Sequence, residues 1–276
     1  MTTLSKTGRR PGEPARTLPG TAGRTWVERV MGIPVSLVVR GPDVRSPATE
    51  AIAAEFFGHL RRVDAIFSTY RTDSQLSRWA RGELALADAD PSVREVLVLC
   101  ELARQSTGGY FDARSLPHPL GPGTRFDPSG LLKGWAVQRA ARHLADLDRH
   151  GWCVNAGGDV LVHAPAGDAP WRVGLEDPAH PGRLLRLVDA RTGAVATSST
   201  AHRGAHVVDP HTARPATGTR AVTVIGPSLL WADVYATAAA ARGRGALAWL
   251  ATIDGYEALR VDSDGTIDAT AGWPAD

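Results

Sequence analysis

An alanine-rich segment near the C-terminus restricts the fold more than any other part of the sequence. Ser228 is expected to cap a helix in which Asp233 and Thr237 share a face that is otherwise mostly alanine. The two residues are four positions apart, so their side chains lie one helical turn apart. A lone buried carboxylate is energetically costly. The sequence therefore predicts that Asp233 faces a cation or a dense set of hydrogen-bond donors.

A second segment, residues 127–136, has the composition of an anion-binding helix start. It reads Asp-Pro-Ser-Gly-Leu-Leu-Lys-Gly-Trp-Ala, so Lys133 follows a turn in which Gly130 could expose its carbonyl group. Free N–H groups and the helix dipole would stabilise a phosphate close to Lys133. The segment is not a Walker A loop, because its glycine spacing differs and no Ser or Thr follows the lysine. A capped amphipathic helix with a surface lysine is the alternative.

The distribution of charge and cysteine excludes several classes of protein. The net charge is +2, but residues 1–24 hold five basic residues and one acidic residue, so the remainder is slightly acidic and we expect no nucleic-acid partner. Cys100 and Cys153 have no CxxC spacing and are expected to be packing residues. Residues 1–24 lack an apolar signal core. We therefore expect a cytoplasmic protein without a membrane partner, with a disordered arm at 1–24 and one domain at 25–276.

The rest of the chain alternates between helical and strand patterns. Residues 26–40 alternate in polarity and predict one strand around Met31. Residues 152–163 contain two apolar runs separated by Asn-Ala-Gly-Gly-Asp, for which a hairpin is the commoner explanation. Shorter strands are expected at 171–176, 184–189 and 221–226, with a closing pair near 258–267.

Two amphipathic helices are predicted in the first half of the chain. Each begins with a capping residue followed by proline, at Ser46 and at Asp90. The second ends at the glycine pair 108–109. We predict an α+β fold, mainly antiparallel sheets with packed helices, and an active-site cleft between two lobes.

Several sequence pieces from about Met31 to the C-terminus resemble the ApbE family of FAD:protein FMN transferases, and they occur in the family's order. The pieces are Phe67-Ser-Thr-Tyr-Arg-Thr-Asp-Ser-Gln-Leu-Ser, Gly109-Tyr-Phe-Asp112, the 127–136 segment, Val154-Asn-Ala-Gly-Gly-Asp, Ala196-Thr-Ser, His206-Val-Val-Asp-Pro and Ala232-Asp-Val-Tyr-Ala-Thr237. One piece alone would be uninformative. The ordered set is a specific signal for the family.

The resemblance implies a metal site and a flavin site. It implies that Asp233 and Thr237 side chains and the Gly130 carbonyl hold Mg²⁺, which prefers oxygen ligands. It implies that FAD, as substrate, is bound by Met31, Ser68, Tyr70, Ser74, Asp112, Asp127, Lys133, Asn155, Gly157, Gly158, Thr197 and His206. For Ser74, helix capping is the alternative.

The implied reaction is Mg²⁺-dependent transfer of FMN from FAD to a Ser or Thr hydroxyl of an acceptor protein, with release of AMP. The candidate catalytic residues are Lys133, His206 and Asp159. His206 is the candidate base, although Asp209 or Asp159 could take that role and His206 could only orient its loop. Two other functions stay open: an FAD pyrophosphatase that gives FMN and AMP, and a non-catalytic FAD-binding protein.

The sequence departs from the family pattern in its loops. Ser199 and Ala213 replace glycines, which would strain a backbone with positive φ. Ala80 stands where asparagine is usual. The family's acceptors have an Asp-x-x-Ser/Thr-Gly-Ala-Ser/Thr motif, and residues 189–195 come close to it. Because Val195 has no hydroxyl at the modified position, we predict that the chain does not flavinylate itself there.

Overall fold

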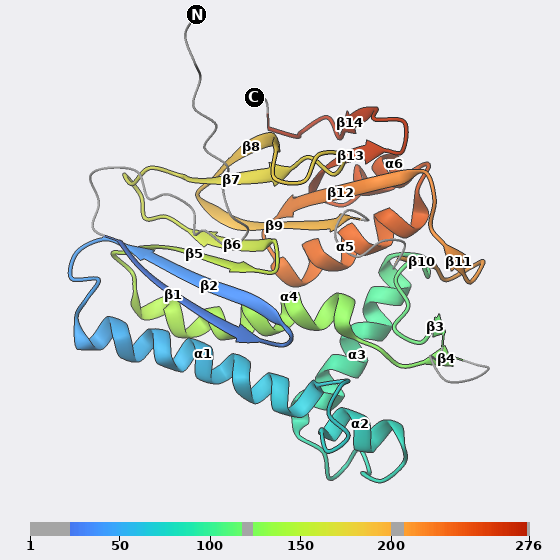
Figure 1. Ribbon diagram of the computed structural model, residues 1–276, viewed down its shortest axis with the longest axis horizontal. Helices are drawn as coiled ribbons and strands as arrows, with labels where there is room; N and C mark the ends of the chain where they lie inside the picture. The colour runs from blue at the N-terminus through green and yellow to red at the C-terminus, as the bar shows by residue number, and fades with distance from the viewer. Residues whose placement is uncertain (1–22, 118–123, 200–206, 275–276) are drawn as a thin grey trace, which may run out of the picture.

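An eight-stranded antiparallel sheet is the centre of the computed structural model, which describes residues 23–117, 124–199 and 207–274 (Figure 1). Its strands follow the order β1-β2-β5-β6-β9-β12-β13-β14. Their bounds are β1 Gly23–Val30, β2 Ile33–Arg40, β5 Gly151–Ala156, β6 Asp159–His163, β9 Thr192–Ser199, β12 Thr219–Gly226, β13 Glu257–Asp262 and β14 Ile267–Ala269. The predicted α+β class with antiparallel strands is confirmed.

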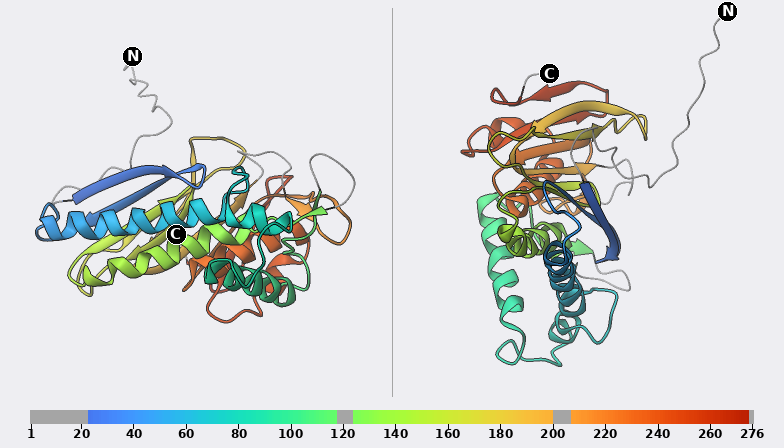
Figure 2. Two further views of the ribbon diagram at one scale, coloured as in Figure 1. Left: turned by 90° about the horizontal axis from the view of Figure 1, so that it is seen from below. Right: turned by 90° about the vertical axis from the view of Figure 1, so that its left-hand side faces the viewer.

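Helices α1, α4 and α5 lie on one side of this sheet (Figure 2). The helices are α1 Pro47–Phe67, α2 Gln75–Ala80, α3 Pro91–Ser106, α4 Ser129–Ala140, the 3-10 helix η1 Ala141–Asp146, α5 Leu229–Arg242 and α6 Ala246–Leu250. The predicted caps are confirmed, because Ser46 and Asp90 side chains accept N–H groups at the starts of α1 and α3. None of the described helices combines the length and the apolar character needed to span a bilayer.

The prediction of one strand over residues 26–40 is wrong, because the chain forms a hairpin there. Met31 and Gly32 have positive φ values of 54° and 74° and form the turn between β1 and β2. The polarity alternates on both sides of this turn, so periodicity alone did not reveal it. Strand β1 already begins at Gly23, whereas residues 1–22 of the predicted arm lie outside the described residues.

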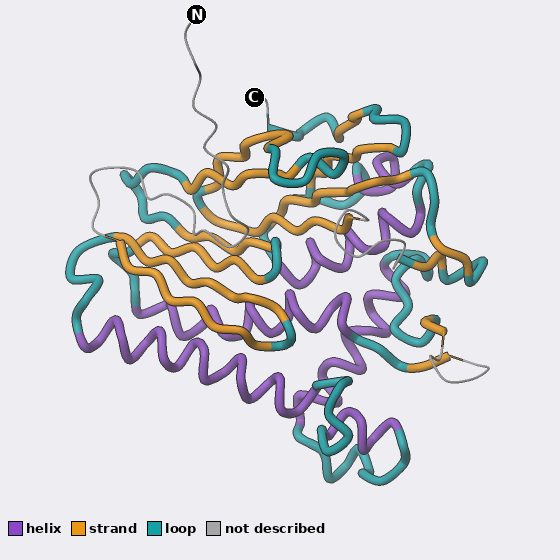
Figure 3. Tube along the Cα trace, in the orientation of Figure 1, coloured by secondary structure: helices purple, strands orange, loops and turns teal. Residues whose placement is uncertain are grey.

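A second hairpin, β7 (Trp171–Glu176) with β8 (Leu184–Ala190), covers the sheet on the side away from the helices. Its apolar side chains form a separate small core with β6 and β9, made of Val160, Val162, Val173, Leu175, Val188 and Val195. Two-residue strands form two further pairs, β3 (Leu116–Pro117) with β4 (Thr124–Arg125) and β10 (Val208–Asp209) with β11 (Arg214–Pro215) (Figure 3).

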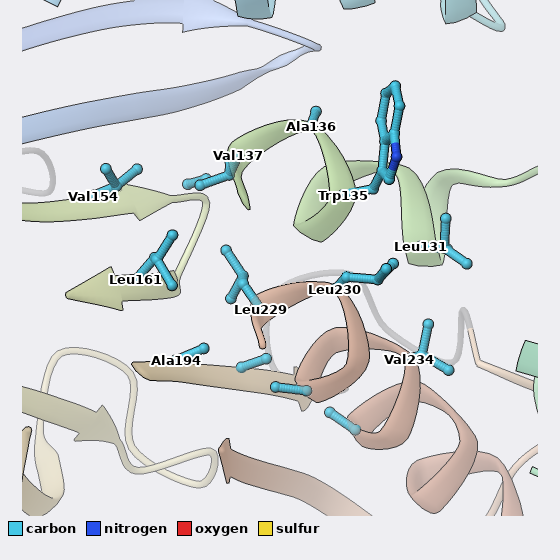
Figure 4. Close-up of a cluster of buried hydrophobic side chains, with 14 of the residues drawn as sticks. Leu131, Trp135, Ala136, Val137, Val154, Leu161, Ala194, Leu229, Leu230 and Val234 are labelled. Atoms are coloured by element: carbon cyan, nitrogen blue, oxygen red, sulfur yellow. The ribbon is translucent and has the colours of Figure 1, made fainter. Parts of the chain in front are cut away.

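Helices α4 and α5 approach each other closely at Gly134. A Cβ atom on Gly134 would lie 2.7 Å from the Leu229 carbonyl oxygen and 3.0 Å from the Leu230 Cα, so only glycine fits there. Apolar side chains of both helices, including Leu131 and Val234, fill the space around this contact (Figure 4). The close approach places the residue before Gly134, Lys133, opposite the polar face of α5.

Candidate functional site

Lys133 and two buried carboxylates form the charged centre of the candidate site. Lys133 lies on α4, Asp159 is the first residue of β6, and Asp233 lies on α5. The Lys133 ammonium forms an ion pair with Asp159, and its Nζ lies 3.6 Å from Asp233 Oδ1. Asp159 is only 1% exposed and Asp233 5% exposed. Asp233 therefore faces a cation, as its position on a buried helix predicts.

The charges in this cluster are not balanced. Burial raises the pKa of Asp233 to about 7; the Lys133 ammonium lowers this pKa and the Asp159 carboxylate raises it. The second oxygen of Asp233, Oδ2, is buried and has no hydrogen-bond partner among the described residues. One ammonium thus serves two carboxylates, and the cluster can accept further positive charge.

Gly130 and Thr237 adjoin this cluster. A Cβ atom on Gly130 would lie 3.7 Å from Thr237 Oγ1, so the first turn of α4 is in contact with the hydroxyl that lies one turn after Asp233 on α5. In the part of the chain that is described, no three His, Cys, Asp or Glu side chains form a metal-binding group. A site made of one carboxylate, one hydroxyl and one carbonyl would not belong to that class. Such oxygen donors suit a hard cation.

Strand β9 connects both parts of the site through two consecutive residues. The backbone N–H of Thr197 donates to Asp159 Oδ1 over 3.1 Å, and Ser198 Oγ lies 3.2 Å from Thr237 Oγ1. The Thr197 hydroxyl is hydrogen-bonded to the Thr223 hydroxyl. Ser198 was not among the predicted site residues, although it belongs to the family-like piece Ala196-Thr-Ser. Its contact depends on strand register, which the sequence does not state.

The turn between β5 and β6 packs against the start of β2. Gly157 and Gly158 have positive φ values of 61° and 106°, and the Gly157 N–H donates to the Pro34 carbonyl over 3.1 Å. The Asn155 side chain accepts the N–H of Gly158 over 2.9 Å. The hairpin interpretation of this diglycine is confirmed. A role of Asn155, Gly157 and Gly158 in flavin binding stays a prediction.

Ser68, Tyr70 and Ser74 lie in the connection between α1 and α2. The Ser74 hydroxyl accepts the Ser77 N–H over 3.1 Å and donates to the Ser68 carbonyl over 2.7 Å, so Ser74 caps α2. Ser74 is 2% exposed and Tyr70 is 94% exposed. The capping alternative for Ser74 is confirmed, and ligand contacts of the three residues stay predictions.

Asp112 and Asp127 shape the chain that leads into α4. Asp127 accepts the Ser129 N–H over 3.0 Å and forms an ion pair with Arg125 at 2.9 Å. Asp112 accepts the Arg114 N–H over 2.8 Å. Both carboxylates therefore have structural partners, and their predicted contacts with FAD are additional to these.

The loop that contains the candidate base is only partly described. His206 lies outside the described residues, whereas Asp209 accepts hydrogen bonds from the His211 N–H and the Thr212 hydroxyl. Of the two glycine replacements, Ala213 has a φ of 55° and Ser199 is the last residue of extended strand β9. The predicted strain is therefore confirmed at Ala213 only.

Two other features lie outside the cluster. A surface hollow of about 390 Å³ is lined by residues of α3, and none of them belongs to the predicted site. Cys100 and Cys153 are packing residues, as predicted, and burial raises the pKa of each thiol to about 12. Neither the hollow nor the thiols add to the chemistry of the site.

Comparisons with known proteins assign most of the chain to one family. The model of the ApbE family matches residues 31–118 and 114–260. A FAD:protein FMN transferase of Rhodobacter capsulatus is 33% identical over 159 residues, which are 54% of this chain and 30% of that protein. One of Vibrio cholerae serotype O1 is 30% identical over 122 residues, which are 40% of this chain and 36% of that protein. The chain thus matches about a third of the length of either relative.

A solved structure shows the same fold over nearly the whole length. The flavin transferase ApbE from Vibrio cholerae superposes with a TM-score of 0.76 at 20% identity, and the match covers 91% of this chain and 98% of that chain. Similarity at this level of identity concerns the arrangement of helices and strands.

Proposed function

The chain belongs to the ApbE family, and we propose that it transfers FMN from FAD to a Ser or Thr hydroxyl of an acceptor protein. The observation that carries the proposal is the cluster of Lys133, Asp159 and Asp233 beside Gly130 and Thr237, because phosphoryl transfer depends mainly on such placed charges. The acceptor oxygen bonds to the phosphorus of FMN, the pyrophosphate bond breaks, and AMP leaves while the hydroxyl proton passes to a base.

Magnesium fits the oxygen atoms of α4 and α5. Asp233 and Thr237 would hold it with the Gly130 carbonyl, since Asp233 Oδ2 is buried without a hydrogen-bond partner among the described residues and Gly130 adjoins the Thr237 hydroxyl. When bound, Mg²⁺ would offset the charge of the pyrophosphate and stabilise the leaving oxygen of AMP.

Lys133 is the candidate for direct contact with the phosphates. Its ammonium is a compact charge on a flexible stem, and Lys133 is the fifth residue of α4, one turn after the helix begins at Ser129. Before the nucleotide binds, Asp159 pairs with this ammonium, and Asp159 is itself held by the Thr197 N–H. These residues act by position and charge rather than by covalent chemistry.

His206 is our candidate for the base. Of its two alternatives, Asp209 already accepts two hydrogen bonds within its own turn, and Asp159 is paired with Lys133. A histidine has an ordinary pKa near neutrality and can accept the acceptor's hydroxyl proton.

The flavin and adenosine parts of FAD would contact the β1–β2 and β5–β6 turns, the connection between α1 and α2, the chain before α4 and strand β9. The proposed contacts are Met31, Ser68, Tyr70, Ser74, Asp112, Asp127, Asn155, Gly157, Gly158 and Thr197. The glycines of the β5–β6 turn, which have positive φ, support this proposal because they allow backbone to approach a ligand closely. The proposed acceptor contains the Asp-x-x-Ser/Thr-Gly-Ala-Ser/Thr motif.

The experiment is incubation of the purified chain with FAD and Mg²⁺, with and without a peptide that contains this motif. Mass spectrometry measures FMN on the peptide, and chromatography measures AMP. Equal amounts of AMP and FMN-peptide are expected, and a peptide with Ala at the modified position should gain nothing. AMP released without peptide would favour the pyrophosphatase, and bound but intact FAD would favour the non-catalytic protein.

A further inference from the structure

We propose that Lys133 is the internal counter-ion of Asp159 and Asp233 in the protein without metal and nucleotide, and that it moves to the pyrophosphate of FAD when a divalent cation binds. This inference rests on the proposed function and concerns the order of events in that same site. It predicts that cation and nucleotide strengthen each other's binding through one side chain.

The position of Lys133 is the first argument. Its ammonium pairs with Asp159 and lies 3.6 Å from Asp233. Taken without the backbone, the Asp159 side chain is 2% exposed and the Asp233 side chain 7% exposed. The Lys133 side chain is 23% exposed, so it is the only one of these three with appreciable access to solvent. Its flexible stem allows the ammonium to leave while the carboxylates stay buried.

The carboxylates are fixed independently of the lysine, which is the second argument. Asp159 Oδ1 accepts the Thr197 N–H of β9, and Asp233 belongs to the buried face of α5. Departure of the ammonium would thus leave both acids in place, as preformed ligands or neighbours for another cation. Asp233 Oδ2, which has no hydrogen-bond partner among the described residues, is already available to it.

Charge decides the order of events. With Lys133 in place the two carboxylates carry one positive partner, and a divalent cation added beside it would be repelled by the ammonium. A pyrophosphate supplies negative charge to which the ammonium can turn. Coupling between two ligands is reciprocal. FAD should therefore raise the affinity of the protein for the cation, and the cation should raise the affinity of the protein for FAD.

The first test is a double-mutant cycle in the absence of metal and nucleotide, with Lys133→Met, Asp159→Asn and both together. Loss of the lysine leaves two buried carboxylates unpaired, so Lys133→Met should lower Tm by roughly 10 °C. The double variant has the same cluster charge as the wild type and should recover at least half of that loss. An equal Tm for Lys133→Met and the double variant would overturn the counter-ion assignment.

The second test uses Mn²⁺ as the probe, with affinity measured by electron paramagnetic resonance. Without FAD, Lys133→Met should bind Mn²⁺ about tenfold more tightly than the wild type, because the competing ammonium is gone. With FAD present, the affinity of the wild type should rise about tenfold and that of the variant much less. Equal responses to FAD in both proteins would contradict the exchange.

Two further variants keep the tests decisive. If Lys133→Met does not fold, Lys133→Arg is used instead, because it retains the positive charge. This variant should keep the wild-type Tm and should bind Mn²⁺ as weakly as the wild type does in the absence of FAD. Tight binding of Mn²⁺ by Lys133→Arg would refute the competition between the side-chain cation and the metal. Arg142→Met removes one charge at an exposed position and should change neither measurement.

FMN transfer is scored separately from these binding measurements. A wild type that passes both tests without transferring FMN would disprove the proposed function alone. If the wild type transfers FMN but the double-mutant cycle shows no coupling between Lys133 and Asp159, only the proposed movement of Lys133 would be disproved.

Discussion

Strands β6 and β9 are packed in opposite ways on their two faces. Toward the β7–β8 hairpin, Val160, Val162 and Val195 meet apolar partners in the small core. Toward the helices, the same strands present apolar residues and also Asp159 and Ser198, which contact Lys133 and Thr237. One pair of strands thus separates an apolar layer from a layer that contains buried charge.

The difference shows where the protein gives up stability for chemistry. The apolar face stabilises the fold by burial alone. The helix face holds two buried carboxylates with one ammonium, and Asp233 Oδ2 has no hydrogen-bond partner among the described residues. Substitutions on the two faces should therefore separate loss of activity from loss of stability.

The largest effect is expected for Asp233→Asn on the charged face. Loss of the carboxylate removes a proposed Mg²⁺ ligand. The transition state should thereby lose several kcal/mol of charge stabilisation, which corresponds to roughly a thousandfold fall in the rate of FMN transfer. Transfer is measured by mass spectrometry of the acceptor peptide. Asp88→Asn, an exposed carboxylate, is the matched control and should keep full activity. Full activity in Asp233→Asn would refute the metal assignment.

The same variant should not lose stability. The folded pKa of Asp233 lies near 7, above the ordinary value of 3.8, so the folded state binds the proton more tightly than the unfolded state. Ionisation therefore destabilises the metal-free protein as pH rises between these two values. Thermal unfolding at pH 8 should give Asp233→Asn a Tm at or above that of the wild type. A clear fall in Tm would mean that the carboxylate stabilises the fold.

The opposite outcome is expected on the apolar face. Leu175 is 5% exposed in the small core, and Leu175→Ala should lower the free energy of unfolding by about 2–5 kcal/mol through lost burial and a cavity. Urea denaturation measures this loss, while transfer by the folded enzyme should be unchanged. Leu187→Ala is the control, because Leu187 is 49% exposed. This substitution should change the free energy of unfolding by less than about 0.5 kcal/mol.

A smaller effect is expected at Ser198, where the sheet contacts a residue of the proposed metal site. Ser198→Ala removes the hydroxyl partner of Thr237, and loss of such an outer contact should weaken Mn²⁺ binding about tenfold. Ser198→Thr retains the hydroxyl and should bind nearly as the wild type does. If Ser198→Ala binds Mn²⁺ normally, then Thr237 is oriented by other groups.

The fold was largely predictable from local signals. Ser46 before Pro47 and Asp90 before Pro91 mark helix starts that depend only on neighbouring residues. The diglycine at 157–158 predicted its hairpin for the same reason. The turn at Met31–Gly32 was missed because the alternating pattern continues across it, and Met31 has a positive φ that is uncommon for a residue other than glycine.

The site was predictable only where a charged residue stands in a segment whose other residues indicate burial. Asp233 on an alanine-rich helix indicated a cationic partner, and the structure provides Lys133. The contact of Ser198 with Thr237 and the close approach at Gly134 could not be predicted, because they depend on strand register and helix crossing between residues far apart in the chain. The family resemblance named Thr197 and Asp159 without stating that they are hydrogen-bonded to each other.

The smallest effect, none at all on flavin incorporation, is expected when the acceptor-like segment at 189–195 is completed. Val195→Thr would create Asp-Ala-Arg-Thr-Gly-Ala-Thr, yet residue 195 is 3% exposed and faces the small core between β6 and β12. A hydroxyl there could reach FAD only if β9 left the sheet. After incubation with FAD and Mg²⁺, the intact mass should be unchanged, whereas a free peptide of the same sequence should gain FMN. Addition of FMN at residue 195 of the folded variant would show that the two faces are not separated as the structure indicates.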